Sequence, residues 1–305
     1  MQNGALDHRA FLASLSAEER GALTERRDGP GLWHLAGHAG LIVILGSWIA
    51  FGGVLWWALL PIQGVLIAFL FTLQHECTHG TPFKTRWLNQ AVGVAAGALL
   101  VQPFHWFKAF HMAHHRYTND PERDPELQGD AKPETLAQMI WHLSTIGYWA
   151  SKLRVLVSLS IGQVEHNFGG GATKARIIRE ARFLLAFYAG VAVFSIAVSP
   201  ILLWAWLVPL ALGFPVLRLY LLAEHDRCPP VANMFENSRT TLTNRLVRAL
   251  AWNMPYHAEH HAFPAVPFHQ LPQLHNGAKA HIQTVTPGYL AFTKDKLAEV
   301  CTARA

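Results

Sequence analysis

Residues 39–74 of this 305-residue chain read AGLIVILGSWIAFGGVLWWALLPIQGVLIAFLFTLQ, a run of 36 residues without Asp, Glu, Lys or Arg. A helix needs about 20 apolar residues to cross a bilayer, so the run is too long for one span and long enough for two. It therefore predicts a hairpin of two transmembrane helices. The turn is expected near Gly52-Gly53 or at Pro61, because these residues interrupt a helix.

A second uncharged run, residues 183–217, repeats this pattern over 35 residues and is broken near its middle by Ser199-Pro200. The whole chain is 51% hydrophobic and 15% charged, whereas soluble domains average about 25% charged residues. These observations predict an all-α integral membrane protein with two transmembrane helical hairpins, or about four spans. Residues 87–104 are also uncharged but short for a span, and the sequence leaves open whether they cross the membrane.

The basic residues predict which side of the membrane the rest of the chain occupies. All 25 lysines and arginines lie outside the two runs: four before the first, twelve between them and nine after the second. Two hairpins place all of these on one side, which the positive-inside rule identifies as the cytoplasm. The first 30 residues contain no apolar signal-peptide core and close with a turn signal, DGPG, at residues 28–31. We therefore expect both termini to be cytoplasmic, in a cell inner membrane.

Three short histidine clusters stand after or between these runs: HECTH at residues 75–79, HMAHH at 111–115 and HAEHH at 257–261. Within each cluster the histidines are three or four residues apart, which places them on one face of a helix. Eight histidines are too many for one metal ion, because zinc sites usually have three or four protein ligands. Two metal ions fit the count better, although imidazole alone does not select the metal.

Composition and context narrow the chemistry. The formal net charge of +5 comes without a basic block interleaved with aromatic residues, so we expect no nucleic-acid binding. The scattered cysteines Cys77, Cys228 and Cys301 do not form a disulfide framework, which agrees with a reducing compartment. A two-metal centre at a membrane surface suits oxidation of a lipid-soluble substrate by O2. This favours iron over zinc, which has no redox chemistry.

The set H-x3-H, H-x2-HH and H-x2-HH, separated by hydrophobic hairpins, resembles the integral-membrane fatty acid desaturase superfamily over roughly residues 35–275. That superfamily also includes alkane hydroxylases and carotenoid hydroxylases and ketolases. The resemblance implies two non-haem iron ions, O2 as co-substrate, and electrons from a ferredoxin, a rubredoxin or cytochrome b5 with its reductase. It also implies a further histidine after the second hairpin, a place that His225 occupies. The expected metal ligands are His75, His79, His111, His114, His115, His225, His257, His260 and His261.

Acidic residues near the clusters have alternative roles. Glu76 and Glu259 either accept the free N–H of a ligand histidine or face solvent, and the sequence does not decide between the two. Asp120 and Asp124 could support a ligand in the same way, but capping of turns is favoured. Asn253, one expected helical turn before the third cluster, is a further candidate support.

The other residues of ligand type are expected to have no metal role. Cys77 lies inside the first cluster, where we expect it to be a small packed residue. Nine histidines lack the cluster spacing and are expected at the surface or behind the ligands: His8, His34, His38, His105, His142, His166, His269, His275 and His281.

The sequence thus predicts a cytoplasmic N-terminal segment (1–35), a membrane desaturase-like di-iron domain with a cytoplasmic histidine-rich helical cap (36–275), and a cytoplasmic tail (276–305). We expect an O2-dependent oxidoreductase that desaturates a lipid acyl chain. Hydroxylation or ketone formation on an alkyl chain or carotenoid ring is the close alternative, because these reactions begin with the same hydrogen abstraction. A histidine-rich metal transporter is the non-enzyme alternative, but it predicts ionisable residues within the spans, and the two runs have none.

Overall fold

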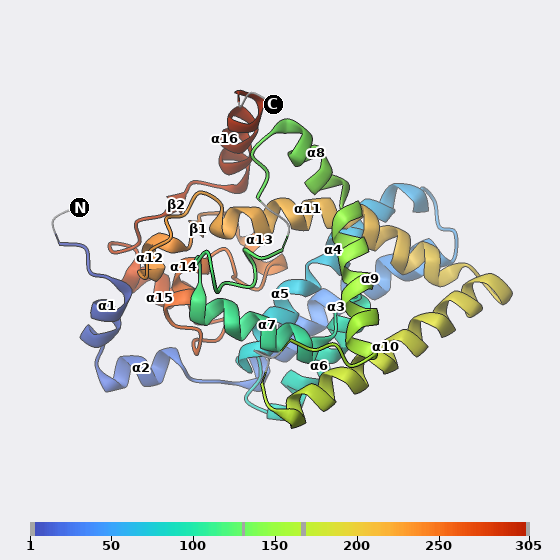
Figure 1. The fold of residues 1–305 in the computed structure, drawn as a ribbon, viewed down its shortest axis with the longest axis horizontal. Coiled ribbons are helices and arrows are strands. Elements are labelled where there is room, and N and C mark those ends of the chain that lie inside the picture. Colours follow the sequence, from blue (N-terminus) through green and yellow to red (C-terminus); the bar gives the residue numbers. More distant parts are fainter. Residues whose placement is uncertain (1–3, 130–131, 166–168, 303–305) are drawn as a thin grey trace.

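The computed structural model describes residues 4–129, 132–165 and 169–302, and these parts of the chain are mainly helical (Figure 1). Up to the first histidine cluster the elements are α1 (His8–Ser14), α2 (Ala17–Leu23), α3 (Asp28–Ala50), η1 (Trp56–Leu59), α4 (Leu60–Ala68) and α5 (Leu70–His79). The middle of the chain forms α6 (Arg86–Leu99), α7 (Phe104–Tyr117), α8 (Leu136–Ser144), α9 (Ile146–Ser160), α10 (Gly171–Ala197), η2 (Leu203–Leu207) and α11 (Val208–His225). The remainder forms α12 (Met234–Asn237), β1 (Thr240–Thr241), α13 (Arg245–Leu250), α14 (His257–Ala262), α15 (Leu271–Ala278), β2 (Val285–Thr286) and α16 (Tyr289–Thr302).

Four helical segments of the described chain are long and apolar enough to cross a membrane: Ala17–Ala50, Trp56–His79, Gly171–Ala197 and Leu203–His225. The predicted all-α membrane architecture is therefore confirmed. The first hairpin turns at Gly52, whose φ of +66° favours glycine, whereas Pro61 lies in the first turn of α4, where the missing N–H costs little. The second hairpin breaks after Ala197, as Ser199-Pro200 predicts.

Both hairpin tips lie at the same end of the molecule, on the right in Figure 1. Trp56 of η1 and Trp204 of η2 pack edge to face with ring centroids 5.6 Å apart. Gln63 reaches from α4 and donates to the backbone oxygens of Ile42 and Ala205, which belong to the neighbouring spans. At the opposite end, α5 terminates at His79 and α11 at His225. The hairpins thus carry candidate metal ligands at their ends.

A close backbone contact between Gly64 of α4 and Gly213 of α11 joins the two hairpins. A Cβ atom on Gly64 would lie 1.9 Å from the carbonyl oxygen of Pro209, and one on Gly213 would lie 2.0 Å from the carbonyl carbon of Gly64. Small residues allow helices to approach this closely inside a membrane. This contact holds α4, which leads into α5, against α11.

Three parts of the chain differ from or refine the sequence expectations. Residues 28–31 form the first turn of α3 instead of a separate turn, because Asp28 accepts hydrogen bonds from the N–H and the hydroxyl of Thr85 and Pro30 is tolerated in a first helical turn. Residues 87–104 lie mostly in α6, which with 14 residues is not among the candidate spans of the described chain. Residues 135–165, whose mixed polar and apolar sequence predicts a helix lying on the membrane surface, form two helices, because Thr145 adopts a left-handed conformation between α8 and α9.

The C-terminal part packs onto the helices that carry the histidines. β2 pairs in parallel with β1, matching Thr240 to Val285. On α16, the buried Lys296 lies 3.2 Å from Asp226, the residue directly after His225. The segment 276–302 is therefore fastened to the end of α11.

Replacement of Gly64 by Ala should separate α4 from α11. Overpacking of this kind costs about 1–3 kcal/mol, so we expect Gly64→Ala to lower the thermal unfolding midpoint of the detergent-solubilised protein and its retained metal. The matched control is Gly190→Ala in α10, where a methyl group would meet no described atom within 4 Å. Equal midpoints for the two variants would contradict the role assigned to the glycine contact.

Candidate metal centre

Four helices bring the predicted histidines together. His75 and His79 lie one turn apart near the end of α5, and α7 carries His111, His114 and His115. His225 is the last residue of α11, and the short helix α14 carries the remaining three. Gly80, with a φ of +67°, ends α5 directly after its second histidine. All nine histidines named from the sequence therefore meet in one region.

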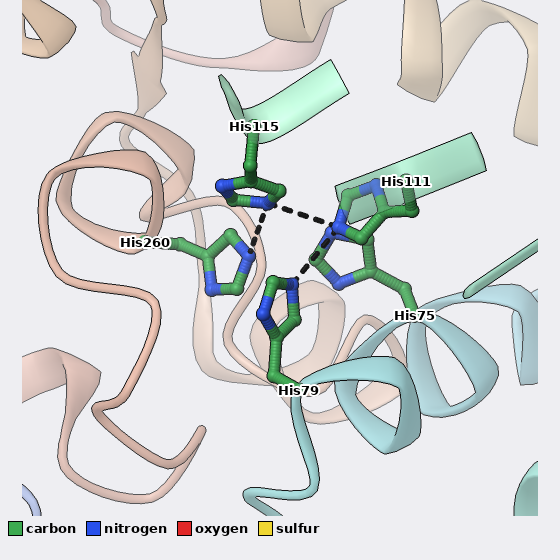
Figure 2. Close-up of side chains that lie close together, drawn as sticks. All are labelled: His75, His79, His111, His115 and His260. Carbon is green, nitrogen blue, oxygen red and sulfur yellow. Dashed lines mark hydrogen bonds between the residues drawn. The ribbon is translucent and has the colours of Figure 1, made fainter. Parts of the chain in front are cut away.

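Five of them form one compact group. One ring nitrogen from each lies within 4.8 Å of the others, and the members are His75, His79, His111, His115 and His260. Figure 2 shows the five rings facing a common point. The Nε2 atom of His111 lies 2.9 Å from that of His79 and 2.9 Å from that of His115. Three segments far apart in the sequence supply this group.

The second group lies beside the first and consists of His114, His225 and His261, whose ring nitrogens are also within 4.8 Å of one another. His257 adjoins it, because its Nε2 atom is 2.9 Å from the Nε2 atom of His225. The nine histidines therefore divide into five and four. This division fits two metal ions better than one.

The rings are oriented by contacts to their outer nitrogen. The Nδ1 atom of His114 lies 2.9 Å from Asp124, that of His225 lies 3.2 Å from the carbonyl oxygen of Asn237, and that of His261 lies 3.2 Å from the Thr118 hydroxyl. A bond at Nδ1 fixes the tautomer and leaves Nε2 free to bind a metal, which is the usual arrangement of histidine ligands. The inner ends of these three rings are thus available.

Carboxylates stand behind three of the ligands. Besides Asp124, Glu224 lies 3.5 Å from Nδ1 of His257, and the fully buried Glu76 lies 3.6 Å from Nδ1 of His260. The other oxygen of Glu76 accepts from the Thr81 hydroxyl and the N–H of Phe268. Glu76 therefore links the first and third clusters. Of the two roles left open by the sequence, its position favours support of a ligand histidine over exposure to solvent.

The other sequence candidates for support have different partners. Glu259 accepts hydrogen bonds from Thr240 and His275, and Asp120 caps the turn that follows α7. Asp124 both caps this turn, at the N–H groups of Asn119 and Glu126, and contacts His114, so capping was only half of its role. Asn253 was wrongly placed: it has a φ of +57°, so no helix joins it to the third cluster, and its amide donates to Phe268.

Burial favours the neutral form of most candidate ligands outside the spans. It lowers the pKa of five of them well below the usual value, and the neighbouring rings lower it further; these are His111, His115, His257, His260 and His261. For His114, burial also lowers the pKa, but the carboxylates of Glu126 and Asp124 outweigh it and raise the pKa. A neutral imidazole has a lone pair to give to a metal.

Unpartnered histidine nitrogens are a further sign that these residues bind metal ions. Both ring nitrogens of the buried His75 and the Nε2 atom of His261 have no hydrogen-bond partner among the described residues. Buried polar atoms without partners are costly, and nitrogen atoms 2.9 Å apart crowd their lone pairs. Cations between the rings would satisfy one nitrogen of each histidine, and iron is among the metals that imidazole binds.

Glu180 positions the second cluster and was not singled out from the sequence. This buried side chain of α10 accepts hydrogen bonds from the N–H groups of Phe104 and His105, the first residues of α7, at 2.9 and 2.8 Å. A carboxylate at a helix N-terminus satisfies free N–H groups and favours the helix dipole. No spacing rule links residue 180 to residue 104, so only the fold shows this contact.

The remaining candidates lie away from the ring nitrogens of the two groups. Cys77 is buried and free, as expected of a packed residue. His34 and His38 lie on α3, His105 pairs with Glu180, and His281 accepts from the N–H of Leu6. His166 lies outside the described residues.

The sequence of this chain is similar to those of known proteins. The sequence model of the family described as "Fatty acid desaturase" matches residues 54–293. The sn-1 oleoyl-lipid 12-desaturase of Picosynechococcus sp. is 24% identical over 251 residues, which cover 73% of this chain and 70% of that protein. Dihydrorhizobitoxine desaturase of Bradyrhizobium elkanii is 30% identical over 259 residues, covering 77% and 70%. The sn-1 acyl-lipid omega-3 desaturase (ferredoxin) of Nostoc sp. is 30% identical over 100 residues, covering 32% and 26%.

Loss of the charge behind His114 should weaken metal binding. Replacing a carboxylate that supports a histidine ligand costs about 10- to 100-fold in metal affinity or activity, so we expect that loss for Asp124→Asn, measured as metal retained during titration with a chelator. The amide oxygen of Asn can still cap the turn. Asp120→Asn is the matched control, because Asp120 serves the same turn without contacting a histidine. Equal retention by the two variants would show that Asp124 acts only as a cap.

Proposed function

The chain belongs to the fatty acid desaturase family, and from this premise we propose that it desaturates a lipid acyl chain with two iron ions held by the nine histidines. As a member of this family it is a membrane-bound oxidoreductase. One observation carries the proposal: two adjacent groups of buried ring nitrogens face inward at the ends of the membrane helices. The His75 group would hold one ion, and the His114 group together with His257 the other.

The residues around the centre have separate tasks in this proposal. The histidines present their inner nitrogens, and Asp124 holds the ring of His114 by a hydrogen bond. Glu224 and Glu76 lie 3.5 and 3.6 Å behind His257 and His260, where their charge would compensate part of the metal charge. Phe71 and Phe107 line a cavity that reaches His75 and His111, and their rings lie 5.2 Å apart. An acyl chain lying against these aromatic rings would displace water from the reacting carbons.

The overall reaction is balanced by an external reductant. Two hydrogen atoms leave adjacent methylene groups, two electrons and two protons come from the donor side, and one O2 becomes two water molecules. When bound, the two iron ions supply the redox chemistry of this step. We propose a ferredoxin as donor because one relative is named for it, with rubredoxin or cytochrome b5 and its reductase as alternatives.

Family membership also bears on the alternatives. It favours the enzyme over a metal transporter, since the matched family is one of oxidoreductases. The relatives reported above are named as desaturases, which supports double-bond formation over hydroxylation or ketone formation by the same kind of site. A product heavier by one oxygen atom would favour the hydroxylase instead.

Removal of one histidine from each group should abolish activity. We expect wild-type protein to contain about two iron ions per chain, one for each histidine group, and His114→Ala or His260→Ala to lose iron and unsaturated product. Iron is measured by elemental analysis and product by gas chromatography of the lipids of an expressing host. His281→Ala is the control, because its ring contacts the N-terminal segment. Full activity in protein without a redox metal would refute the proposal.

We propose further that the centre faces the cytoplasm from a cell inner membrane, with segments 1–35 and 276–305 flanking the membrane domain on that side. The exposed Cys301 at the end of α16 should then resist a membrane-impermeant maleimide in intact spheroplasts and react after lysis. In a Cys301→Ser background, Val54→Cys at the exposed tip of the first hairpin should react without lysis. The reverse labelling pattern would invert the topology and leave the chemistry unaffected.

A further inference from the structure

A cavity of about 1330 Å³ opens beside the histidine centre, between α7, α9 and α11. Five of the nine candidate ligands line one part of it: His75, His111, His114, His225 and His257. The aromatic side chains of Phe71, Trp106, Phe107 and Tyr148 line it as well. The cavity therefore connects the centre to residues that the proposed chemistry does not use.

Two of these residues are the cations Lys152 of α9 and Arg218 of α11. Both lie against the ring of Tyr148, with Lys152 Nζ and Arg218 Cζ each 5.2 Å from its centroid. Lys152 also lies 5.5 Å from the Trp106 ring and donates to the side-chain oxygen of Gln102. Among residues 4–129, 132–165 and 169–302, no carboxylate oxygen is within 4 Å of Lys152 Nζ. The described partners of Lys152 are thus two aromatic rings and the side-chain amide of Gln102.

Three of the acidic residues that line the cavity have partners other than Lys152. Glu126 lies 3.7 Å from His114, Glu224 lies 3.5 Å from His257, and Asp226 pairs with Lys296. Glu126 and Glu224 thus stand beside histidine ligands, whereas Lys152 and Arg218 stand against the ring of Tyr148. Burial lowers the pKa of Lys152 to about 7, and the positive charge of Arg218 lowers it further. An anion beside Lys152 would restore its charged form.

The position of the two cations fits the head group of an amphiphile. Arg218 is the first charged residue after the uncharged run 183–217, so it marks the level where α11 leaves the apolar part of the bilayer. Arg218 and His225 are seven residues apart on α11, which corresponds to two turns, nearly one face and about 10 Å. Leu221 and Leu222 line the cavity between them. Along α11 the cavity therefore presents first a cation, then apolar side chains and then the histidine centre.

We propose that Lys152, with Arg218 beside it, binds the anionic head group of the substrate, a carboxylate or a phosphate, and that the substrate is an acidic amphiphile instead of a neutral lipid. That this ligand is the substrate rests on the proposed desaturase function, whereas binding of its head group does not. The carbons presented to the centre would lie about 10 Å from the acid group, as set by the two helical turns. One relative is named for dihydrorhizobitoxine and others for acyl lipids, so family membership does not fix the head group.

Calorimetric titration of the iron-loaded protein in neutral detergent tests this proposal with chain-matched probes: palmitate, palmitoyl lysophosphatidic acid and neutral monopalmitoylglycerol. We expect at least one acidic probe to bind about tenfold more tightly than the neutral one, the range of a charge-assisted hydrogen bond. Preference for palmitate identifies a free acid, and preference for the lysophosphatidic acid identifies a phosphate head group. Equal binding of all three probes by the wild-type protein would overturn the proposal.

Substitutions of Lys152 test whether this residue causes the preference for acidic probes. Lys152→Met should reduce the acid-to-neutral affinity ratio to about one, and Lys152→Arg should keep it, because it retains the charge. Arg154→Met is the matched control, since Arg154 is exposed on the same helix and does not line the cavity. A ratio that Lys152→Met leaves unchanged would overturn the assignment of Lys152. Because the ratio compares probes on one protein, a general loss of stability does not imitate the effect.

Product analysis of the same samples separates the two proposals. Selective binding of an acidic probe without a double bond in any lipid, in reduced and iron-loaded protein, would refute the desaturase function and leave the binding site intact. Unselective binding accompanied by desaturation would refute the head-group site and leave the function intact. Selective binding followed by desaturation of the acidic probe is the result that both proposals expect.

Discussion

The close contact of Gly64 with Gly213 is the constraint on which the rest of the centre depends. It lets α4 and α11 approach until their backbones touch, and the chain then continues from α4 into α5, which ends at His79, while α11 ends at His225. Neither hairpin alone could supply this geometry, because the His75 group draws on α5, α7 and α14 and the His114 group on α7, α11 and α14. A pair of residues without side chains, far from any chemistry, thus sets where the imidazoles meet.

The resulting cluster is costly for a protein to hold without cations. Ring nitrogens that lie within 4.8 Å of one another repel any added proton, and burial together with the neighbouring rings lowers the pKa of the three histidines on α14. The outer nitrogens of His114, His261 and His225 are held by Asp124, Thr118 and the carbonyl oxygen of Asn237, respectively. These contacts fix the tautomers in advance, so metal binding would require little rearrangement of the rings.

The sequence predicted the parts of this structure that follow from local periodicity. The uncharged runs located both hairpins, and spacings of three and four residues placed the clusters on helical faces. What it could not predict were contacts set by tertiary packing. Glu180 caps α7 across 76 residues, and Asn253 was placed on a helix that its left-handed backbone prevents. For Asp124 the sequence favoured the capping role, which is local. Its contact with His114 depends on the fold of the loop and could not be predicted.

A metal centre built from histidines needs negative charge from residues behind the ligands. Imidazoles bring no negative charge to a metal, so compensation must come from behind them, and Glu126, Glu224 and Asp124 lie within 3.7 Å of ligand nitrogens. Asp226, a further acid of the cavity, pairs with Lys296 of α16, so the C-terminal helix compensates that charge. A free anion near the centre would compete with O2 and the electron donor for the metals' positive charge. Cations two helical turns away, at Lys152 and Arg218, offer an anion a binding place outside the centre.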